Sequence, residues 1–173
     1  DLLNSAKQVT DFGLKKQMKV ITPVLLYTAS QAGGADAFDG ILGGTSYYWG
    51  MEDRIPSAKA FNDKFRKAYA GAVPSDYGAL GYAGIRSVLQ AIREARSTTS
   101  TGVANVMRKM RYDFYKGQQF YRLCDHQSVQ SVAIVESKSK NMKDKYDVFN
   151  VLSIEAPDEK NLRTCDELGH KVI

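Results

Sequence analysis

Histidine, cysteine and long apolar runs are scarce in this chain of 173 residues, which contains two His and two Cys. No apolar stretch approaches 18 residues, so the sequence predicts no membrane-spanning helix. With two histidines and no Gly-x-Ser-x-Gly elbow, the sequence offers no convincing group of side chains for nucleophilic catalysis. We therefore expect a protein that is not an enzyme and that uses neither a cofactor nor a metal.

The charge is spread along the chain and not gathered into blocks. The formal net charge is +5, with 25% charged and 43% hydrophobic residues, which is ordinary globular composition. No run of Lys and Arg is dense enough to form a nucleic-acid-binding patch. These features predict a folded protein that has no nucleic acid as a partner.

The beginning of the sequence predicts a piece of a longer protein. The chain starts without Met and without a signal peptide. Its first residues already have the pattern of an amphipathic helix, with Leu2, Ala6 and Val9 on one face. We therefore expect a fragment.

The two cysteines, Cys124 and Cys165, allow two interpretations. A disulfide between them would close a loop of about 40 residues, worth about 4 kcal/mol in the chain-entropy model. Alternatively, both cysteines could bind zinc with His126 and His170, although these spacings match no common zinc pattern. We favour the disulfide, which would place the protein in an oxidising compartment such as the periplasm.

The first third of the chain alternates between β and α patterns. Residues 19–27 form a continuous apolar run typical of a strand covered on both faces. Pro23 indicates either an edge position or pairing that starts after the proline. Residues 28–34 are small and polar and predict a loop, where ligands bind at the carboxyl end of a strand. A second β stretch over 41–49 is interrupted by Gly43 and Gly44.

The strongest helix prediction covers residues 75–96. Ser75 is a natural N-cap, and Leu80, Gly84, Val88 and Ile92 recur every fourth residue, which predicts a mostly buried helix. Tyr77 lies at its start, where an aromatic could clamp a ligand or simply pack. Another helix is predicted over residues 57–71.

The remaining part predicts one more helix and then mainly strands. The predicted elements are a helix with Val103, Val106, Met107 and Met110 on one face, a hairpin over 112–122 turning at Lys116-Gly117, and strands over 129–135 and 146–154. An alternating first segment followed by strands predicts an α/β fold in which the chain passes between two lobes.

Three stretches resemble the C-terminal half of a type I periplasmic binding protein of the leucine/isoleucine/valine-binding branch. These stretches are Gly43-Gly44-Thr45-Ser46-Tyr47-Tyr48-Trp49, the helix pair 57–71 and 74–96, and Cys124-Asp125-His126-Gln127-Ser128-Val129-Gln130 with the strands that follow. Asp-His-Gln ahead of a strand is a habit of this family. The resemblance covers the whole chain.

The resemblance implies part of a two-lobed α/β fold whose lobes are doubly wound three-layer α/β/α units, with the first half of the parent chain missing. Residues 1–44 would complete the sheet of the C-terminal lobe, and residues 45–127 would belong to the N-terminal lobe. Residues 128–173 would return to the C-terminal lobe and form the tail. Gly43, Gly44 and Ser128 would lie at the hinge.

The resemblance also implies a function and a set of ligand-binding residues. The protein would capture a small solute, such as an amino acid or an aromatic carboxylate, for the membrane permease of an ABC importer in the periplasm. The implied contacts are Tyr77, Tyr27, Thr28, Tyr47 and Tyr48. The family presents a polar or acidic group to the amino group of the ligand near residues 27 and 28, and this sequence has no acid at that point. The alternative role is a ligand-sensing receptor or regulator of the same fold.

Overall fold

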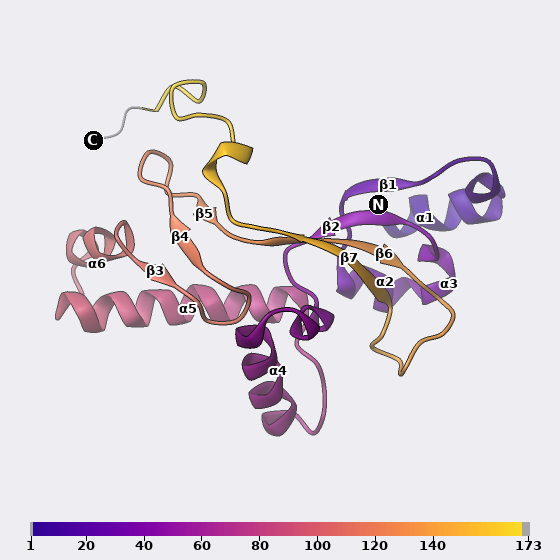
Figure 1. Cartoon of the computed structure of the whole chain (residues 1–173), viewed down its shortest axis with the longest axis horizontal. Coiled ribbons are helices and arrows are strands. Elements are labelled where there is room, and N and C mark those ends of the chain that lie inside the picture. The colour runs from indigo at the N-terminus through magenta and orange to yellow at the C-terminus, as the bar shows by residue number, and fades with distance from the viewer. Residues whose placement is uncertain (1, 171–173) are drawn as a thin grey trace.

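The computed structural model describes residues 2–170 and has two units joined by crossing strands (Figure 1). The first unit contains the four-stranded sheet β1-β2-β6-β7 and the helices α1, α2 and α3, and the second contains α5, α6 and the sheet β3-β4-β5. The α-helices are α1 (Leu2–Asp11), α2 (Tyr27–Gly33), α3 (Ala35–Phe38), α4 (Pro56–Ala68), α5 (Asp76–Ala95) and α6 (Ser100–Met107). The strands are β1 (Ile21–Val24), β2 (Leu42–Thr45), β3 (Arg111–Tyr112), β4 (Gln119–Tyr121), β5 (Ser128–Val129), β6 (Val132–Ser137) and β7 (Phe149–Glu155). Short 3-10 helices are η1 (Leu14–Lys16), η2 (Trp49–Asp53) and η3 (Glu159–Asn161).

In the first sheet, β1 runs parallel to β2, and β6 is antiparallel to both β2 and β7. A Cβ atom on Gly43 would lie 2.6 Å from the Leu25 Cβ and 2.9 Å from the Thr22 carbonyl oxygen. The close approach of β1 therefore accounts for glycine at this position. Gly44 pairs with strands on both sides, so the chain leaves the sheet only after Thr45.

Of the two interpretations of Pro23, the edge position agrees with the structure, since β1 is the end strand of its sheet within residues 2–170. Pairing begins at Ile21, before the proline. The expectation that this strand is covered on both faces is wrong for this chain. Ile21 and Val24 are 72% and 54% exposed. Within residues 2–170, no element covers these two side chains.

Helix α5 begins as predicted, because the Ser75 hydroxyl accepts a hydrogen bond of 3.0 Å from the Gly78 N–H. The prediction that its large apolar stripe is buried is wrong. The buried positions of α5 carry small or polar residues: Asp76, Ala79, Ala83, Ser87 and Ala91. The Tyr121 hydroxyl of β4 donates a 3.0 Å hydrogen bond to Ser87, so this face packs on the hairpin. Leu80, Ile85, Val88 and Leu89 are exposed.

A loop was predicted over residues 28–34, but residues 28–33 instead belong to helix α2, and Gly34 follows its end. The N-cap of this helix is Leu26, which provides no side-chain hydrogen bond to the first turn. The local sequence therefore lacks the usual signal for a helix start. The stabilising contact comes from a residue 49 positions away, described below.

The predicted hairpin is confirmed, with β3 and β4 paired antiparallel through Arg111–Phe120 and Tyr112–Gln119. The two late strands are confirmed as β6 and β7. The expected simple alternation along residues 146–154 is interrupted, because Ile134 pairs with Ser153 while Val135 pairs with Val151. This irregularity leaves Leu152 exposed.

An aromatic core joins the two units. The Tyr47 ring lies 5.8 Å from the Phe61 ring and 5.2 Å from the Tyr115 ring, measured between centroids. The next residue, Tyr48, packs on the other side, 5.1 Å from the Phe149 ring. Consecutive residues of one crossing segment therefore anchor both units. None of the helices in the described range has the length and apolar character that spanning a membrane requires.

Candidate functional site

The start of α5 meets the start of α2 at the boundary between the two units. The Asp76 Oδ2 atom accepts a hydrogen bond of 3.1 Å from the Tyr27 N–H, and its Oδ1 atom accepts one of 3.0 Å from the Tyr77 N–H. Asp76 is 1% exposed. Its negative charge lies at the positive ends of both helix dipoles and caps the first turn of α2 from the other unit.

Tyr77 and Thr28 present free hydroxyl groups beside this contact. Tyr77 is 61% exposed, and Thr28 is half-buried. Neither hydroxyl forms a hydrogen bond with another group of residues 2–170, so both remain available for a ligand. Although the sequence around residue 28 has no acid, the Asp76 carboxylate lies close to this position in space, since it accepts from the Tyr27 N–H. Sequence reasoning missed Asp76, which looked only like an acidic residue in the first turn of a helix.

Tyr27 and Tyr48 lie behind the contact and are buried. Their ring centroids are 5.9 Å apart, and burial raises the pKa of both phenols. The Tyr48 hydroxyl donates to the Tyr146 carbonyl oxygen at 3.2 Å and accepts from the Phe149 N–H at 3.4 Å. In this structure, both hydrogen-bonding functions of Tyr48 are used within the chain.

Tyr47 is also fully buried, and its hydroxyl donates a hydrogen bond to the Asn62 Oδ1 atom of α4. The Asn62 amide nitrogen in turn donates to the Trp49 carbonyl oxygen at 2.8 Å and to the Glu52 carboxylate at 2.7 Å. Tyr47 thus fixes the crossing segment to α4. Whether Tyr27, Tyr47 and Tyr48 touch ligand stays a prediction.

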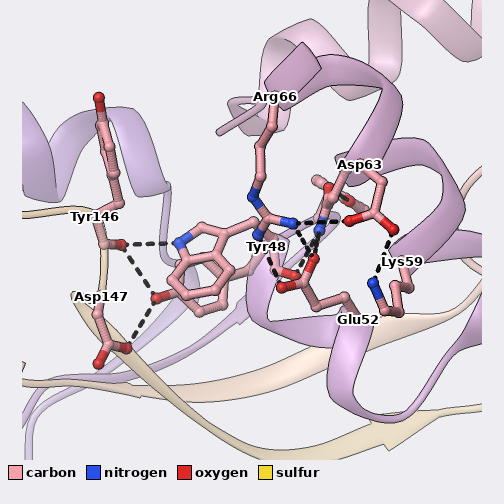
Figure 2. A network of polar contacts seen from close by, with 10 residues as sticks. Tyr48, Glu52, Lys59, Asp63, Arg66, Tyr146 and Asp147 are labelled. Atoms are coloured by element: carbon pink, nitrogen blue, oxygen red, sulfur yellow. Dashed lines mark hydrogen bonds and ion pairs between the residues drawn. The ribbon is translucent and has the colours of Figure 1, made fainter. Parts of the chain in front are cut away.

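A polar network extends this attachment across the boundary (Figure 2). Arg66 of α4 pairs with both Glu52 oxygens at 2.8 and 2.9 Å, and its guanidinium lies 5.7 Å from the centroid of the Trp49 ring. The Trp49 indole N–H donates to the Tyr146 carbonyl oxygen at 2.9 Å. Helix α4 is therefore connected through Trp49 to the loop that precedes β7.

The same loop contains a buried ion pair in which the Asp147 carboxylate lies 2.9 Å from the Lys138 ammonium. Burial alone would raise the pKa of Asp147. The hydrogen bond from the Lys143 N–H, together with the Lys138 charge, outweighs this effect and lowers the pKa.

The predicted disulfide between Cys124 and Cys165 is present, with the Cα atoms 6.0 Å apart. Both sulfur atoms are bonded, so neither is available as a zinc ligand. Arg122 reinforces the same connection, because it is 4% exposed, pairs with Asp125 and donates to the Arg163 carbonyl oxygen at 2.7 Å. The Arg122 guanidinium lowers the pKa of Asp125.

The predicted hinge residue Ser128 lies in β5, where its hydroxyl is 3.3 Å from the Tyr112 hydroxyl. This position is four residues before β6 begins at Val132. Gly43 and Gly44 lie inside β2, paired with neighbouring strands. The hinge assignment of these three residues stays a prediction.

Comparison with known proteins identifies the class. The sequence pattern of the periplasmic binding protein family matches residues 1–143. The chain therefore belongs to this family, whose type I two-lobed fold it represents in part. A comparison with curated protein sequences found no significant match.

Solved structures give the same fold. An amino acid ABC transporter substrate-binding protein from Pseudomonas fluorescens Pf-5 aligns with a TM-score of 0.84 and 24% identity, over 98% of this chain and 44% of that one. A branched-chain amino acid ABC transporter ligand-binding protein from Burkholderia xenovorans LB400 aligns with a TM-score of 0.75 and 24% identity, over 90% and 41%. A solute-binding protein from Rhodopseudomonas palustris BisB5, in complex with 3,4-dihydroxybenzoic acid, aligns with a TM-score of 0.70 and 21% identity, over 89% and 42%. The chain thus spans less than half the length of each of these relatives.

Proposed function

We propose that the complete protein containing this chain is an extracytoplasmic solute-binding protein of an ABC importer. It captures an amino acid or a small aromatic carboxylate between two lobes and delivers it to a membrane permease. The observation that carries this proposal is the contact between Asp76 and Tyr27, which brings two helix starts from different units together. The family match and the named relatives support the same role.

Tyr77 and Thr28 are the proposed ligand contacts, and Tyr27, Tyr47 and Tyr48 form the wall behind them. The Asp76 carboxylate favours a ligand that carries an amino group over a plain acid, because it can accept hydrogen bonds from an ammonium group. Movement of the two units apart would release the Tyr27 N–H and open Asp76 to the ligand.

The missing half of the protein is proposed to cover the exposed apolar faces. Ile85 and Leu89 of α5 are 67% and 61% exposed, and Gly81 and Gly84 share this side of the helix, with open space where a Cβ atom would point. Small residues beside large apolar ones leave room for another backbone to approach. This chain spans 44% of the length of the Pseudomonas fluorescens relative, which supports a further segment of the complete protein as the cover of this face.

A thermal-shift screen of the complete protein tests the proposal. The panel contains branched and aromatic amino acids and aromatic acids, including 3,4-dihydroxybenzoate. A ligand at a hundredfold its dissociation constant adds about 2.7 kcal/mol of stability. No shift with any compound would contradict the proposal.

Two variants then assign the ligand contacts. Tyr77→Ala is expected to weaken binding about tenfold through loss of an aromatic contact. Tyr69→Ala is the matched control, since Tyr69 is equally exposed, at 61%, but lies at the end of α4. Asp76→Asn separates the ligand classes, because it should weaken binding of an amine and leave binding of a plain acid nearly unchanged.

A further inference from the structure

Lys116 is a fully buried lysine at the tip of the β3–β4 hairpin, where a turn residue would normally be solvated. Its ammonium nitrogen donates to the Ser46 carbonyl oxygen at 2.6 Å and to the Ser131 carbonyl oxygen at 3.1 Å. The two acceptors are 85 positions apart in the sequence. A single side chain therefore joins two distant segments of backbone.

Both acceptors lie on segments that cross between the units. Ser46 directly follows β2, and Ser131 directly precedes β6. The last backbone pair between these strands is Thr45–Ala133. The Lys116 ammonium thus holds the two crossing segments together just beyond the end of their ladder.

The hairpin that carries Lys116 is itself fixed to the same region. The Ser131 hydroxyl donates to the Lys116 carbonyl oxygen at 2.7 Å. The neighbouring Gly117 N–H donates to the Ser57 hydroxyl of α4 at 3.1 Å. The position of Lys116 is therefore set by three separate elements and not by solvent.

No carboxylate pairs with Lys116 in the part of the chain that the structure describes. The ionisable groups on the surrounding elements are Tyr47 and Tyr115, whose pKa values are raised by burial, and Asp113, which accepts from the Gly117 N–H. Burial lowers the pKa of Lys116 to about 7. Burial of a cation without a paired anion is unfavourable, so packing alone does not explain why a lysine occupies this position.

We propose that Lys116 is a positioning residue for ligand capture, which clamps the crossing segments at Ser46 and Ser131 and so sets the angle between the two lobes. The inference rests on the proposed function, because the angle matters only in a protein that closes on a ligand. The structure has the clamp and the Asp76–Tyr27 contact formed together. The clamp therefore favours the arrangement in which the lobes meet.

The protonation state of Lys116 adjusts the clamp. The ammonium form makes charge-assisted hydrogen bonds to the two carbonyl groups, and the neutral amine makes weaker ones. Burial lowers the pKa of Lys116, so the loss of hydration outweighs these hydrogen bonds and the buried arrangement favours the neutral amine. As the pH falls through about 7, the clamp should therefore loosen and ligand should dissociate faster. Replacement by Met removes this dependence and retains most of the apolar volume.

The test uses the complete protein, spin-labelled at Gln8→Cys in α1 and Arg93→Cys in α5, both exposed positions. Double electron–electron resonance gives the distribution of distances between the two spin labels. Stopped-flow mixing gives the rate of ligand dissociation. We expect Lys116→Met to broaden the ligand-free distribution and weaken binding about tenfold. Lys15→Met is the matched control, because Lys15 donates to a backbone carbonyl, that of Ala37, at 2.8 Å within one unit.

An unchanged distribution in folded Lys116→Met would overturn the clamp, whether or not a ligand is known. If that variant does not fold, the wild-type protein is compared at pH 6 and pH 8: a broader distance distribution at pH 6 supports the clamp, and a constant distribution overturns it. A wild-type distance that no ligand of the panel alters would instead contradict the proposed function. The experiment can therefore refute the Lys116 clamp and the proposed function independently of each other.

Discussion

Asn62 is predicted to be the most sensitive polar residue of the crossing segment. It is fully buried, accepts from the Tyr47 hydroxyl and donates to the Trp49 carbonyl oxygen and the Glu52 carboxylate. Asn62→Ala leaves the buried Tyr47 hydroxyl and the partly buried Trp49 carbonyl group without their partner. Each orphaned group costs about 1–3 kcal/mol, so we expect a loss of about 4 kcal/mol in the free energy of unfolding.

A double-mutant cycle separates this loss from the cavity that Ala creates. Tyr47→Phe alone should cost about 1–2 kcal/mol, since it orphans only the Asn62 oxygen. In the double variant the Tyr47 hydroxyl no longer needs a partner, so the two losses should fall short of additivity by about 1 kcal/mol. Urea denaturation of the complete protein gives the free energy of unfolding of the wild type, both single variants and the double variant.

The control is Lys59→Met on the same helix, whose exposed ion pair with Asp63 should leave the urea midpoint unchanged. The reasoning is refuted if Asn62→Ala lowers the free energy of unfolding by less than about 1 kcal/mol, or if the cycle is additive. Either result would mean that water replaces the lost partners.

Three further predictions concern the disulfide and two ionisable groups. Replacing both Cys124 and Cys165 by Ser should lower the free energy of unfolding by up to about 4 kcal/mol, measured by urea denaturation; an equal loss on reduction of the wild type is the check. Asp147 has a lowered pKa, so its contribution to stability is present above the unfolded value near 3.8 and is lost as the pH falls through the lower folded value. Asp147→Asn should therefore flatten the acid limb of a plot of stability against pH, and an unchanged limb would contradict this. Lys116 has a folded pKa of about 7 against 10.5, so the unfolded chain binds more protons between these values and stability should rise with pH there. Lys116→Met should remove this rise, so that the free energy of unfolding of the variant changes less with pH over that range than that of the wild type; an unchanged slope would contradict the assignment.

The sequence predicts most elements of this fold because their signals are local. Ser75 shows the pattern: its cap and the helix that follows were both predictable, and the structure has both. Helix α2 was not predictable, because its first turn is capped by Asp76, which lies far away in the sequence. Local reasoning saw only small polar residues there and predicted a loop.

Burial was harder to predict than secondary structure. The stripe containing Val88 and Leu89 implied a buried helix, and the side that packs within this chain is instead lined by Ala79 and Ala83. Hydrophobic periodicity identifies the face of a helix that is to be buried, but it does not identify the segment that packs against this face. Lys116 shows the opposite case, since its place in a Lys-Gly turn gave no sign that the side chain is buried.

Candidate residues for the site could be named from the sequence, but their arrangement in space could not be predicted. Tyr77 is exposed beside the contact between the units, in agreement with its expected position at a helix start. The roles of Tyr47 and Tyr48 in packing depend on partners such as Asn62 and Tyr146, which no local pattern connects to them. Asp76 became visible only when the two helix starts were seen together.

The disulfide between Cys124 and Cys165 makes the later part of the chain a covalent ring. The ring contains β5, β6 and β7, so it passes from the second unit into the first and back again. The exposed turn around residues 140–145 is its far point. A protease that cuts this turn opens the ring without dividing the molecule, so the nicked protein remains in one piece until the disulfide is reduced. The two units are thus linked by a covalent connection that survives a cut in this turn.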